Sequence, residues 1–323
     1  MHNRSVRFDE AALRSSQPLW TSTAVPSAAS SLIFASSDER RPYLVFIRAG
    51  ADSLHRRLLD ENPDRNWDCC IDWYVDPNRE RLAEYYCGGG NGQSVNKLEG
   101  FLEFRQSLAG PWPYRYVLLL DDDIYLRPGD LSRFFELCDR HGTFLSQPAL
   151  RWFTHTTLNS LVRNPACLLR RVSFVEGMAP CFSSAALDQL VHTFRWTRSI
   201  WGTDWAWACL LEDLETIHVV DSVAMDHTRT GNGRPTLFYR KLRAMGIDPG
   251  EELQSIRRMF PGFQGPRTLP HGHVFRPQVP RHLAGGIMLV FERLKVIVRV
   301  RKQLLRLFRV WRARIEDYVR GVK

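Results

Sequence analysis

The fold is decided by the stretch Tyr116-Val117-Leu118-Leu119-Leu120-Asp121-Asp122-Asp123-Ile124-Tyr125. Its apolar run predicts a strand that is buried on both faces of a parallel sheet. Three carboxylates follow at once, and open α/β sheets bind ligands at the carboxyl ends of their strands. In an extended conformation Asp121 and Asp123 point to one side and Asp122 to the other. Because two carboxylates on one side repel each other unless a cation lies between them, the pattern favours a divalent metal site over a solvated acidic turn.

Other strands and helices alternate along the chain. Strands are predicted at Tyr43–Ile47, Trp67–Val75, Thr143–Gln147 (stopped by Pro148) and Ile217–Val220. Helical patterns are predicted at Ser53–Leu59, around Leu98–Phe104, after a cap at Asp130, after Ser183-Ser184 and at Ala206–Leu211. This alternation indicates βαβ units, and therefore the α/β class with a mostly parallel sheet flanked by helices.

Composition limits the classes of function. The formal charge is +9, but residues 287–323 hold eleven Lys and Arg against three Asp and Glu, so this tail carries +8 and the rest only +1. The nearly neutral body gives no support for nucleic-acid binding. Seven cysteines without a CxxC pair argue against a disulfide framework or a structural zinc site, and no secretory signal is visible. We therefore expect a reducing, cytoplasmic location.

Three further features bear on chemistry. Asp204 follows Trp201-Gly202-Thr203 at a helix start, where backbone N–H groups favour an ionised carboxylate that can take a proton from a hydroxyl; a plain helix cap is an equal alternative. His227 follows a predicted strand and, together with two carboxylates, would complete a common divalent-metal set, although a lone His is more often structural. Gly88-Gly89-Gly90-Asn91-Gly92 with Lys97 suits phosphate contact but is not a P-loop.

Taken together, these motifs resemble the GT-A-type nucleotide-sugar glycosyltransferases. More narrowly, a poorly characterised bacterial and plant family is similar in five stretches between about Pro42 and Gly262, and its plant members are labelled "lysine-ketoglutarate reductase trans-splicing related". These stretches are Tyr116–Tyr125, Gln147-Pro148-Ala149, Phe174–Pro180, Trp201–Trp205 and Val220–Arg229. The label suggests work on RNA, which the near-neutral body does not support.

The resemblance implies a role for each site residue. Asp121 and Asp123 match the DxD that binds the metal and the diphosphate, and His227 matches the late metal ligand, with Mn²⁺ or Mg²⁺ as the cofactor. Asp204 matches the catalytic base of inverting enzymes, although Thr203 stands where many such enzymes have Glu. Arg48, Lys97 and Asp122 would join Asp121 in binding the nucleotide sugar. Glu176 would either hold acceptor hydroxyls or be a buried structural carboxylate, and both interpretations stay open.

The expected reaction is metal-dependent, inverting transfer of a sugar from a nucleotide-sugar donor to a hydroxyl acceptor. One alternative is a haloacid-dehalogenase-type phosphatase, but its DxD motif requires Thr or Val where Tyr125 stands and usually occupies the first strand. Another is a non-enzymatic membrane or partner adaptor on a degenerate transferase fold. The joint retention of Asp121, Asp123, Asp204 and His227 speaks against it.

Four segments are expected: a poorly ordered leader (1–40), a GT-A-like catalytic domain (41–262), a Pro/Gly linker (263–285) and a basic amphipathic helix (286–323). The helix carries an apolar stripe wider than a coiled-coil seam, and its longest charge-free apolar run is far below the ~20 residues needed to span a bilayer. We expect it to lie on an anionic membrane, at the cytoplasmic face and near a glycan or lipid-linked acceptor. A homodimer seam and packing on the chain's own domain are the alternatives.

Overall fold

The central sheet contains the predicted strand, which spans Tyr116–Asp121 (β5). The structure is a computed structural model and describes residues 33–34, 40–60, 64–74, 82–88, 96–127, 129–154, 156, 158–211, 216–228, 237–298 and 300–301. Most of the predicted leader, the glycine-rich turn at 89–92 and residues 302–323 lie outside the described residues.

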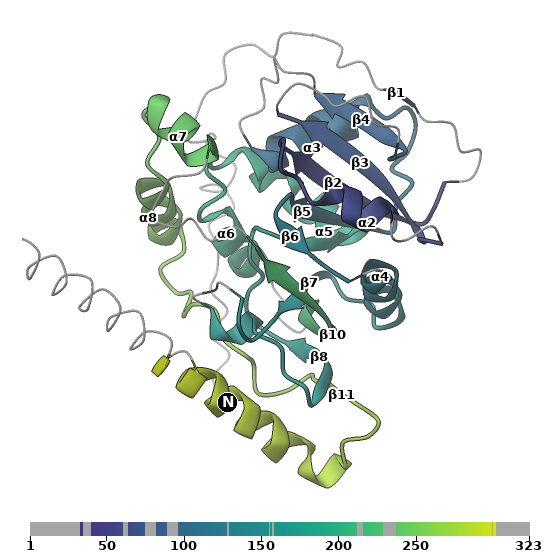
Figure 1. Cartoon of the computed structure of the whole chain (residues 1–323). Helices are drawn as coiled ribbons and strands as arrows, with labels where there is room; N and C mark the ends of the chain where they lie inside the picture. The colour runs from purple at the N-terminus through teal and green to yellow at the C-terminus, as the bar shows by residue number, and fades with distance from the viewer. Residues whose placement is uncertain are drawn as a thin grey trace, which may run out of the picture.

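The strands of the described chain form one continuous arrangement. Besides β5 they are Ile33–Phe34 (β1), Tyr43–Ala49 (β2), Trp67–Trp73 (β3), Tyr85–Gly88 (β4), Ile124–Tyr125 (β6), Leu145–Leu150 (β7), Cys167–Arg171 (β8), Cys181–Ser183 (β9), Ile217–His227 (β10) and Val274–Phe275 (β11). Their order is β1-β4-β3-β2-β5-β9-β7-β10-β8-β11, and β6 pairs with β10. The four longest pairings, β2 with β3, β2 with β5, β3 with β4 and β7 with β10, are parallel. The predicted α/β class with a mostly parallel sheet is confirmed (Figure 1).

Helices flank this sheet. They span His55–Asp60 (α2), Lys97–Ser107 (α3), Asp130–Arg140 (α4), Ser184–Leu190 (α5), Thr203–Leu210 (α6), Leu237–Ala244 (α7) and Pro249–Met259 (α8), with short 3₁₀ turns at Asn159–Leu161 (η1) and Val191–Arg195 (η2). A last helix covers residues 281–298. None of the helices in the described part of the chain is long and apolar enough to cross a membrane.

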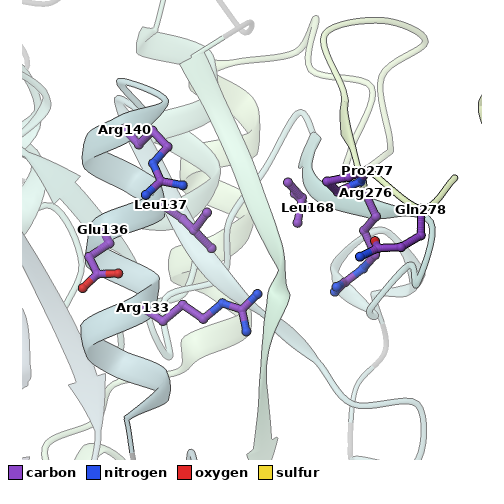
Figure 2. A pocket seen from close by; sticks show the side chains of 8 residues that line it. All are labelled: Arg133, Glu136, Leu137, Arg140, Leu168, Arg276, Pro277 and Gln278. Atoms are coloured by element: carbon purple, nitrogen blue, oxygen red, sulfur yellow. The ribbon is translucent and has the colours of Figure 1, made fainter. Parts of the chain in front are cut away.

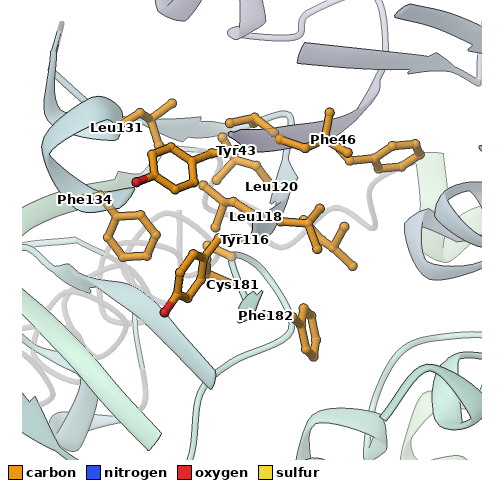
Figure 3. Close-up of a cluster of buried hydrophobic side chains, with 14 of the residues drawn as sticks. Tyr43, Phe46, Tyr116, Leu118, Leu120, Leu131, Phe134, Cys181 and Phe182 are labelled. Carbon is orange, nitrogen blue, oxygen red and sulfur yellow. The ribbon is translucent and has the colours of Figure 1, made fainter. Parts of the chain in front are cut away.

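The core lies where α3 and α4 press on opposite faces of the central strands. Tyr43 of β2 stacks on Phe135 of α4 with ring centroids 4.9 Å apart, whereas Phe46 meets Phe101 of α3 at 5.5 Å. Positions 43 and 46 are an odd number of residues apart, so their side chains point to opposite faces of the strand. Figure 3 shows the α4 side of this core, where Tyr43 lies beside Leu131 and Phe134. Removing one such buried ring costs roughly 3–5 kcal/mol of folding free energy, so these contacts hold the strand ends in place.

Several local expectations need correction. β7 runs through Pro148 to Leu150 instead of stopping at Gln147, because Pro148 lies where the register with β10 shifts, a place where a missing N–H is tolerated. Gly129, in the left-handed conformation, caps α4, and Asp130 is the first helical residue. The helices α7 and α8 were not predicted.

The segment predicted as a linker packs on the domain. The backbone N–H of Ser173 donates to Arg267 O at 2.9 Å, and that of Arg276 donates to Ala166 O at 3.0 Å. β11 also adds an antiparallel strand to β8. This Pro/Gly-rich segment is therefore held by backbone hydrogen bonds, a feature that residue composition does not reveal.

The helix at 281–298 begins earlier than predicted and rests on the same edge of the sheet. Met288 and Ala284 are buried, and Met288 packs against Ala166 and Cys167. Packing on the chain's own domain, one of the expected alternatives, is thus found for the described part of this helix.

A buried charge network fixes the same helix. Arg170 and Asp221 form an ion pair at 3.0 Å with both side chains fully buried, and Glu292 from the helix lies 3.2 Å from Arg170. Lys295 closes the network at 2.5 Å from Glu292. Because each charge has an opposite partner, the helix cannot leave the domain without exposing uncompensated buried charges.

Candidate active site

The acidic turn lies at the carboxyl end of β5, as the sequence predicted. Asp121 is the last residue of the strand, and Asp122 and Asp123 form the turn before β6. Lys97, at the start of α3, donates to Asp121 Oδ1 at 2.6 Å, to Leu119 O at 3.0 Å and to Met178 O at 2.9 Å. The ammonium group is buried and its three N–H bonds are all used, so Lys97 supports Asp121 from beneath the site.

Asp122 and Arg48 hold the neighbouring loops. Asp122 Oδ2 accepts from the backbone N–H of Gly50 at 2.8 Å and from Tyr74 Oη at 3.3 Å, and thereby fixes the turn that follows β2. Arg48 donates to Asp72 Oδ2 at 2.8 Å and to Asn96 O at 3.0 Å. Both residues therefore position the strand ends around the acidic turn, and their predicted contacts with a nucleotide sugar stay predictions.

Asp123 and His227 meet because β6 pairs with the end of β10. In that pairing His227 lies opposite Ile124, the residue directly after Asp123. His227 Nε2 is 3.3 Å from Asp123 Oδ2, and the hydrogen bond to this carboxylate raises the pKa of His227. The backbone N–H of Thr228 also donates to Asp123 O at 3.0 Å, which fixes the two chains in register.

A second pair of carboxyl groups, Glu176 and Asp204, lies beside this turn. The backbone N–H of Gly177 donates to Asp204 Oδ2 at 3.1 Å, and that of Trp205 donates to Asp204 Oδ1 at 2.9 Å. A Cβ on Gly177 would come within 2.9 Å of Ile200 Cγ2, so glycine permits this close approach. Asp204 is thus anchored in the first turn of α6, as the sequence predicted.

The turn that delivers Asp204 is conformationally unusual. Ile200 has φ 72°, in the left-handed region that β-branched residues rarely adopt, and Gly202, which caps α6, has φ 91°. Glycine adopts positive φ without strain, whereas the strain at Ile200, on the order of 1–3 kcal/mol, persists where surrounding contacts enforce it and is concentrated at functional sites. Here it places a carboxylate against Gly177 instead of leaving it in solvent.

Both carboxyl groups hold their protons more tightly than usual. Burial raises the pKa of Glu176 to about 7, and the nearby charge of Asp204 adds to this. Burial also raises the pKa of Asp204 to about 6, against the opposing effect of backbone N–H groups from Gly177 and Trp205. Among the described residues nothing bonds to Glu176 Oε2, which is buried. Carboxyl groups with pKa values near neutrality suit proton transfer at physiological pH.

The two clusters form one site. The backbone N–H of Asp121 donates to Met178 O at 2.9 Å, two residues after Glu176, so the acidic turn and the Glu176–Asp204 pair are close in space. Two further residues join them. Gln147 Oε1 accepts from the backbone N–H of Glu176 at 2.6 Å, and Tyr239 Oη of α7 accepts from Trp201 Nε1, three residues before Asp204, at 3.0 Å.

These two residues were not predicted as part of the site. Gln147 stood in one of the quoted motifs, so its buried amide had a sequence signal. Tyr239 had no such sequence signal, because it lies on a helix that was not predicted and its direction could not be inferred.

Two donors of the site fit a divalent cation. In an octahedral ion with ligands at about 2.1 Å, neighbouring donors are about 3 Å apart, close to the 3.3 Å between Asp123 and His227. A carboxylate oxygen beside an imidazole nitrogen also suits Mn²⁺. Within the described ranges, however, no three His, Cys, Asp or Glu side chains converge on one point, and Asp121 is paired with Lys97.

Comparisons with known proteins give likenesses of structure only. No protein-family model matches the chain, and none of the curated proteins matches it, so the narrower bacterial and plant resemblance finds no support there. Among solved structures, the chain is similar to GalNAc-T7 with UDP, GalNAc and Mn²⁺ (10% identity, 69% of this chain and 48% of that one, TM-score 0.46). It is also similar to S. aureus TarS (9% identity, 68% of this chain and 44% of that one, TM-score 0.42). A third similar structure is S. aureus TarS 1–349 with UDP-GlcNAc (9% identity, 68% of this chain and 73% of that one, TM-score 0.42). The match spans about half the length of GalNAc-T7 and of full TarS.

Proposed function

We propose that this protein is a divalent-metal-dependent glycosyltransferase that moves a sugar from a nucleotide-sugar donor to a hydroxyl acceptor with inversion. One observation carries the proposal: at the carboxyl ends of β5 and β10, Asp123 and His227 meet at 3.3 Å beside the Glu176–Asp204 pair. The first pair suits a cation and the second suits proton transfer. Metal-assisted, inverting sugar transfer from a diphosphate uses both functions next to each other.

Asp123 and His227 would hold the cation, Mn²⁺ or Mg²⁺, and Asp121 would lie next to it. When bound, such an ion would neutralise the diphosphate of the donor and stabilise the charge that develops on it as the sugar leaves. Lys97 balances the charge of Asp121, which limits repulsion within the acidic turn while no cation is bound. Arg48 and Asp122 keep the loops around the nucleotide in place.

Asp204 is the better candidate for the base. Its pKa, raised to about 6, lies below that of Glu176, raised to about 7, so Asp204 is the more readily ionised of the two. The backbone N–H groups of Gly177 and Trp205 also hold the Asp204 carboxylate in one orientation. Asp204 would take the proton of the acceptor hydroxyl during in-line attack, and Glu176, through its unpartnered Oε2, would hydrogen-bond an acceptor hydroxyl.

A screen of nucleotide sugars tests the function. We expect one or more of them to raise the melting temperature in Mn²⁺ or Mg²⁺ but not in EDTA, and the same compounds to be hydrolysed slowly without acceptor. Equal stabilisation in EDTA, or none by any nucleotide sugar, would contradict the proposal.

The proposal extends to the location of the enzyme. The outward face of helix 281–298 exposes Leu283, Leu289, Val290, Leu294, Val296 and Ile297, and it is flanked by exposed Arg281, Arg293 and Arg301. An apolar face bordered by arginines is typical of a helix that lies in an anionic membrane surface. The enzyme would then work at the cytoplasmic membrane face on a glycan or lipid-linked acceptor. Because Met288 is buried on the domain, only the outward face is open to a membrane or to a second copy of the chain.

A further inference from the structure

A separate cavity of about 290 Å³ lies between α4 and the segment after β11, and it shares no lining residue with the candidate active site (Figure 2). This volume is close to the lower end, roughly 300 Å³, of the range for small-molecule sites. Its polar walls include Arg133 and Arg140 of α4 and Arg276 and Gln278 of the following segment, with Leu137 and Leu168 as apolar floor.

The charge of the cavity is strongly positive. Glu136, its one carboxylate, is three and four residues from Arg133 and Arg140 and therefore well spaced to pair with either on the helix. It instead accepts a hydrogen bond from Asn66 Nδ2 at 3.4 Å. In the part of the chain that the structure describes, the guanidinium groups of Arg133 and Arg140 form no ion pair, and Figure 2 shows Glu136 on the side of α4 away from Arg276.

Arg133 and Arg140 alone do not indicate a binding site, since exposed arginines on a helix are ordinarily solvated. Arg276 is different. Its Nη2 atom is buried and, among the described residues, has no hydrogen-bond partner. Burial and the nearby charges of Arg163 and Arg133 lower the pKa of Arg276, and the opposing charge of Asp221 does not offset them. A buried guanidinium N–H without an acceptor lowers stability, and an incoming anion would supply that acceptor.

We propose that this cavity is a binding site for a phosphoryl group, held by Arg133, Arg140 and Arg276. Guanidinium groups bind phosphate oxygens with two parallel hydrogen bonds, and three of them around one cavity match the charge and the several acceptors of a mono- or diphosphate. A single carboxylate would leave most of these donors unused. The group belongs either to a free phosphate compound or to a lipid headgroup.

Inorganic pyrophosphate in EDTA probes this site without loading the metal site. By isothermal titration calorimetry we expect measurable binding to the full chain, weakened about tenfold or more in R276Q and in R133Q/R140Q. R258Q removes one exposed arginine on α8 and serves as the charge-matched control, and D123N tests the active site; both should bind as the parent does. Equal affinity in parent and R133Q/R140Q, whose exposed positions leave folding intact, would overturn the proposal.

A second arm separates the two sources of the phosphoryl group. Vesicles of phosphatidylcholine with phosphatidic acid are compared with phosphatidylcholine alone in co-sedimentation. If pyrophosphate does not bind but phosphatidic acid vesicles do, and R133Q/R140Q lowers that binding several-fold while R258Q does not, the ligand is a lipid headgroup. Binding of neither probe would contradict the site, whatever the outcome of the nucleotide-sugar screen.

Discussion

The backbone N–H of Gly177 donates to Asp204 Oδ2 at 3.1 Å, so the residue that follows Glu176 is joined directly to the proposed base. The bond fixes the Asp204 carboxylate relative to the backbone beside Glu176. We therefore first test which of the two carboxyl groups is the base and which binds the acceptor.

Asp204→Asn should keep metal and nucleotide affinity but lower kcat by on the order of 10²-fold or more, because the amide cannot accept the hydroxyl proton. Glu176→Gln should act mainly on KM for the acceptor, since its amide can still hydrogen-bond a hydroxyl. Steady-state kinetics for both variants with one donor and acceptor pair checks this. If D204N transfers at the parental rate while E176Q is inactive, the two roles are exchanged.

The same pair predicts how stability depends on pH. Both pKa values are raised in the folded state, to about 6 for Asp204 and about 7 for Glu176, so the folded protein binds more protons than the unfolded chain. This contribution to the free energy of unfolding is present at low pH and is lost as pH rises through the folded pKa values. Between pH 5 and pH 8, the free energy of unfolding of the metal-free parent, measured in urea, should fall by on the order of 2 kcal/mol more than that of the Glu176→Gln variant. Parallel pH profiles for the two proteins would show that Glu176 titrates normally.

Asp123→Asn should abolish the melting-temperature shift that a nucleotide gives in Mn²⁺, because it removes the carboxylate beside His227. Asp188→Asn, which changes an exposed carboxylate paired with Arg105, is the matched control and should keep the shift. A full shift in D123N would mean that the cation binds elsewhere.

The sequence predicted the strand, the acidic turn and the anchored Asp204 because each depends on neighbours in the chain: an apolar run, the carboxylates that follow it, and a helix start. The meeting of Asp123 with His227 depends on the antiparallel pairing of β6 with β10, between residues about a hundred positions apart. Proximity of that kind came from the family resemblance and not from any local pattern. Tyr239 lies on a helix that follows residues outside the described ranges, and no periodicity relates it to the site.

Lys97 is another residue whose contacts could not be predicted from the local sequence. Its position after glycines suggested phosphate contact, yet its ammonium is buried and bonds to Asp121, Leu119 O and Met178 O. Lys97→Met should therefore destabilise the nucleotide-free protein by about 2–3 kcal/mol, less than for a fully buried pair because the Asp121 side chain is 40% exposed. Adding Asp121→Asn should restore part of the loss. Urea unfolding without nucleotide measures both, and an unchanged midpoint in K97M would return Lys97 to a binding role.

The two faces of helix 281–298 should have separable roles. Leu294→Glu/Ile297→Glu places charge on the outward face, where both side chains are exposed, and should abolish co-sedimentation with anionic vesicles while the melting temperature stays the same. Met288→Ala changes the buried face and should lower stability by roughly 2–3 kcal/mol without changing vesicle binding. Vesicles of phosphatidylcholine with and without phosphatidylglycerol, with the full chain in each case, give the comparison. If the parent does not bind anionic vesicles, or if L294E/I297E binds them as the parent does, the helix serves only to pack on the domain. If L294E/I297E instead changes the dimerisation measured by sedimentation, the outward face is an interface between two copies of the chain.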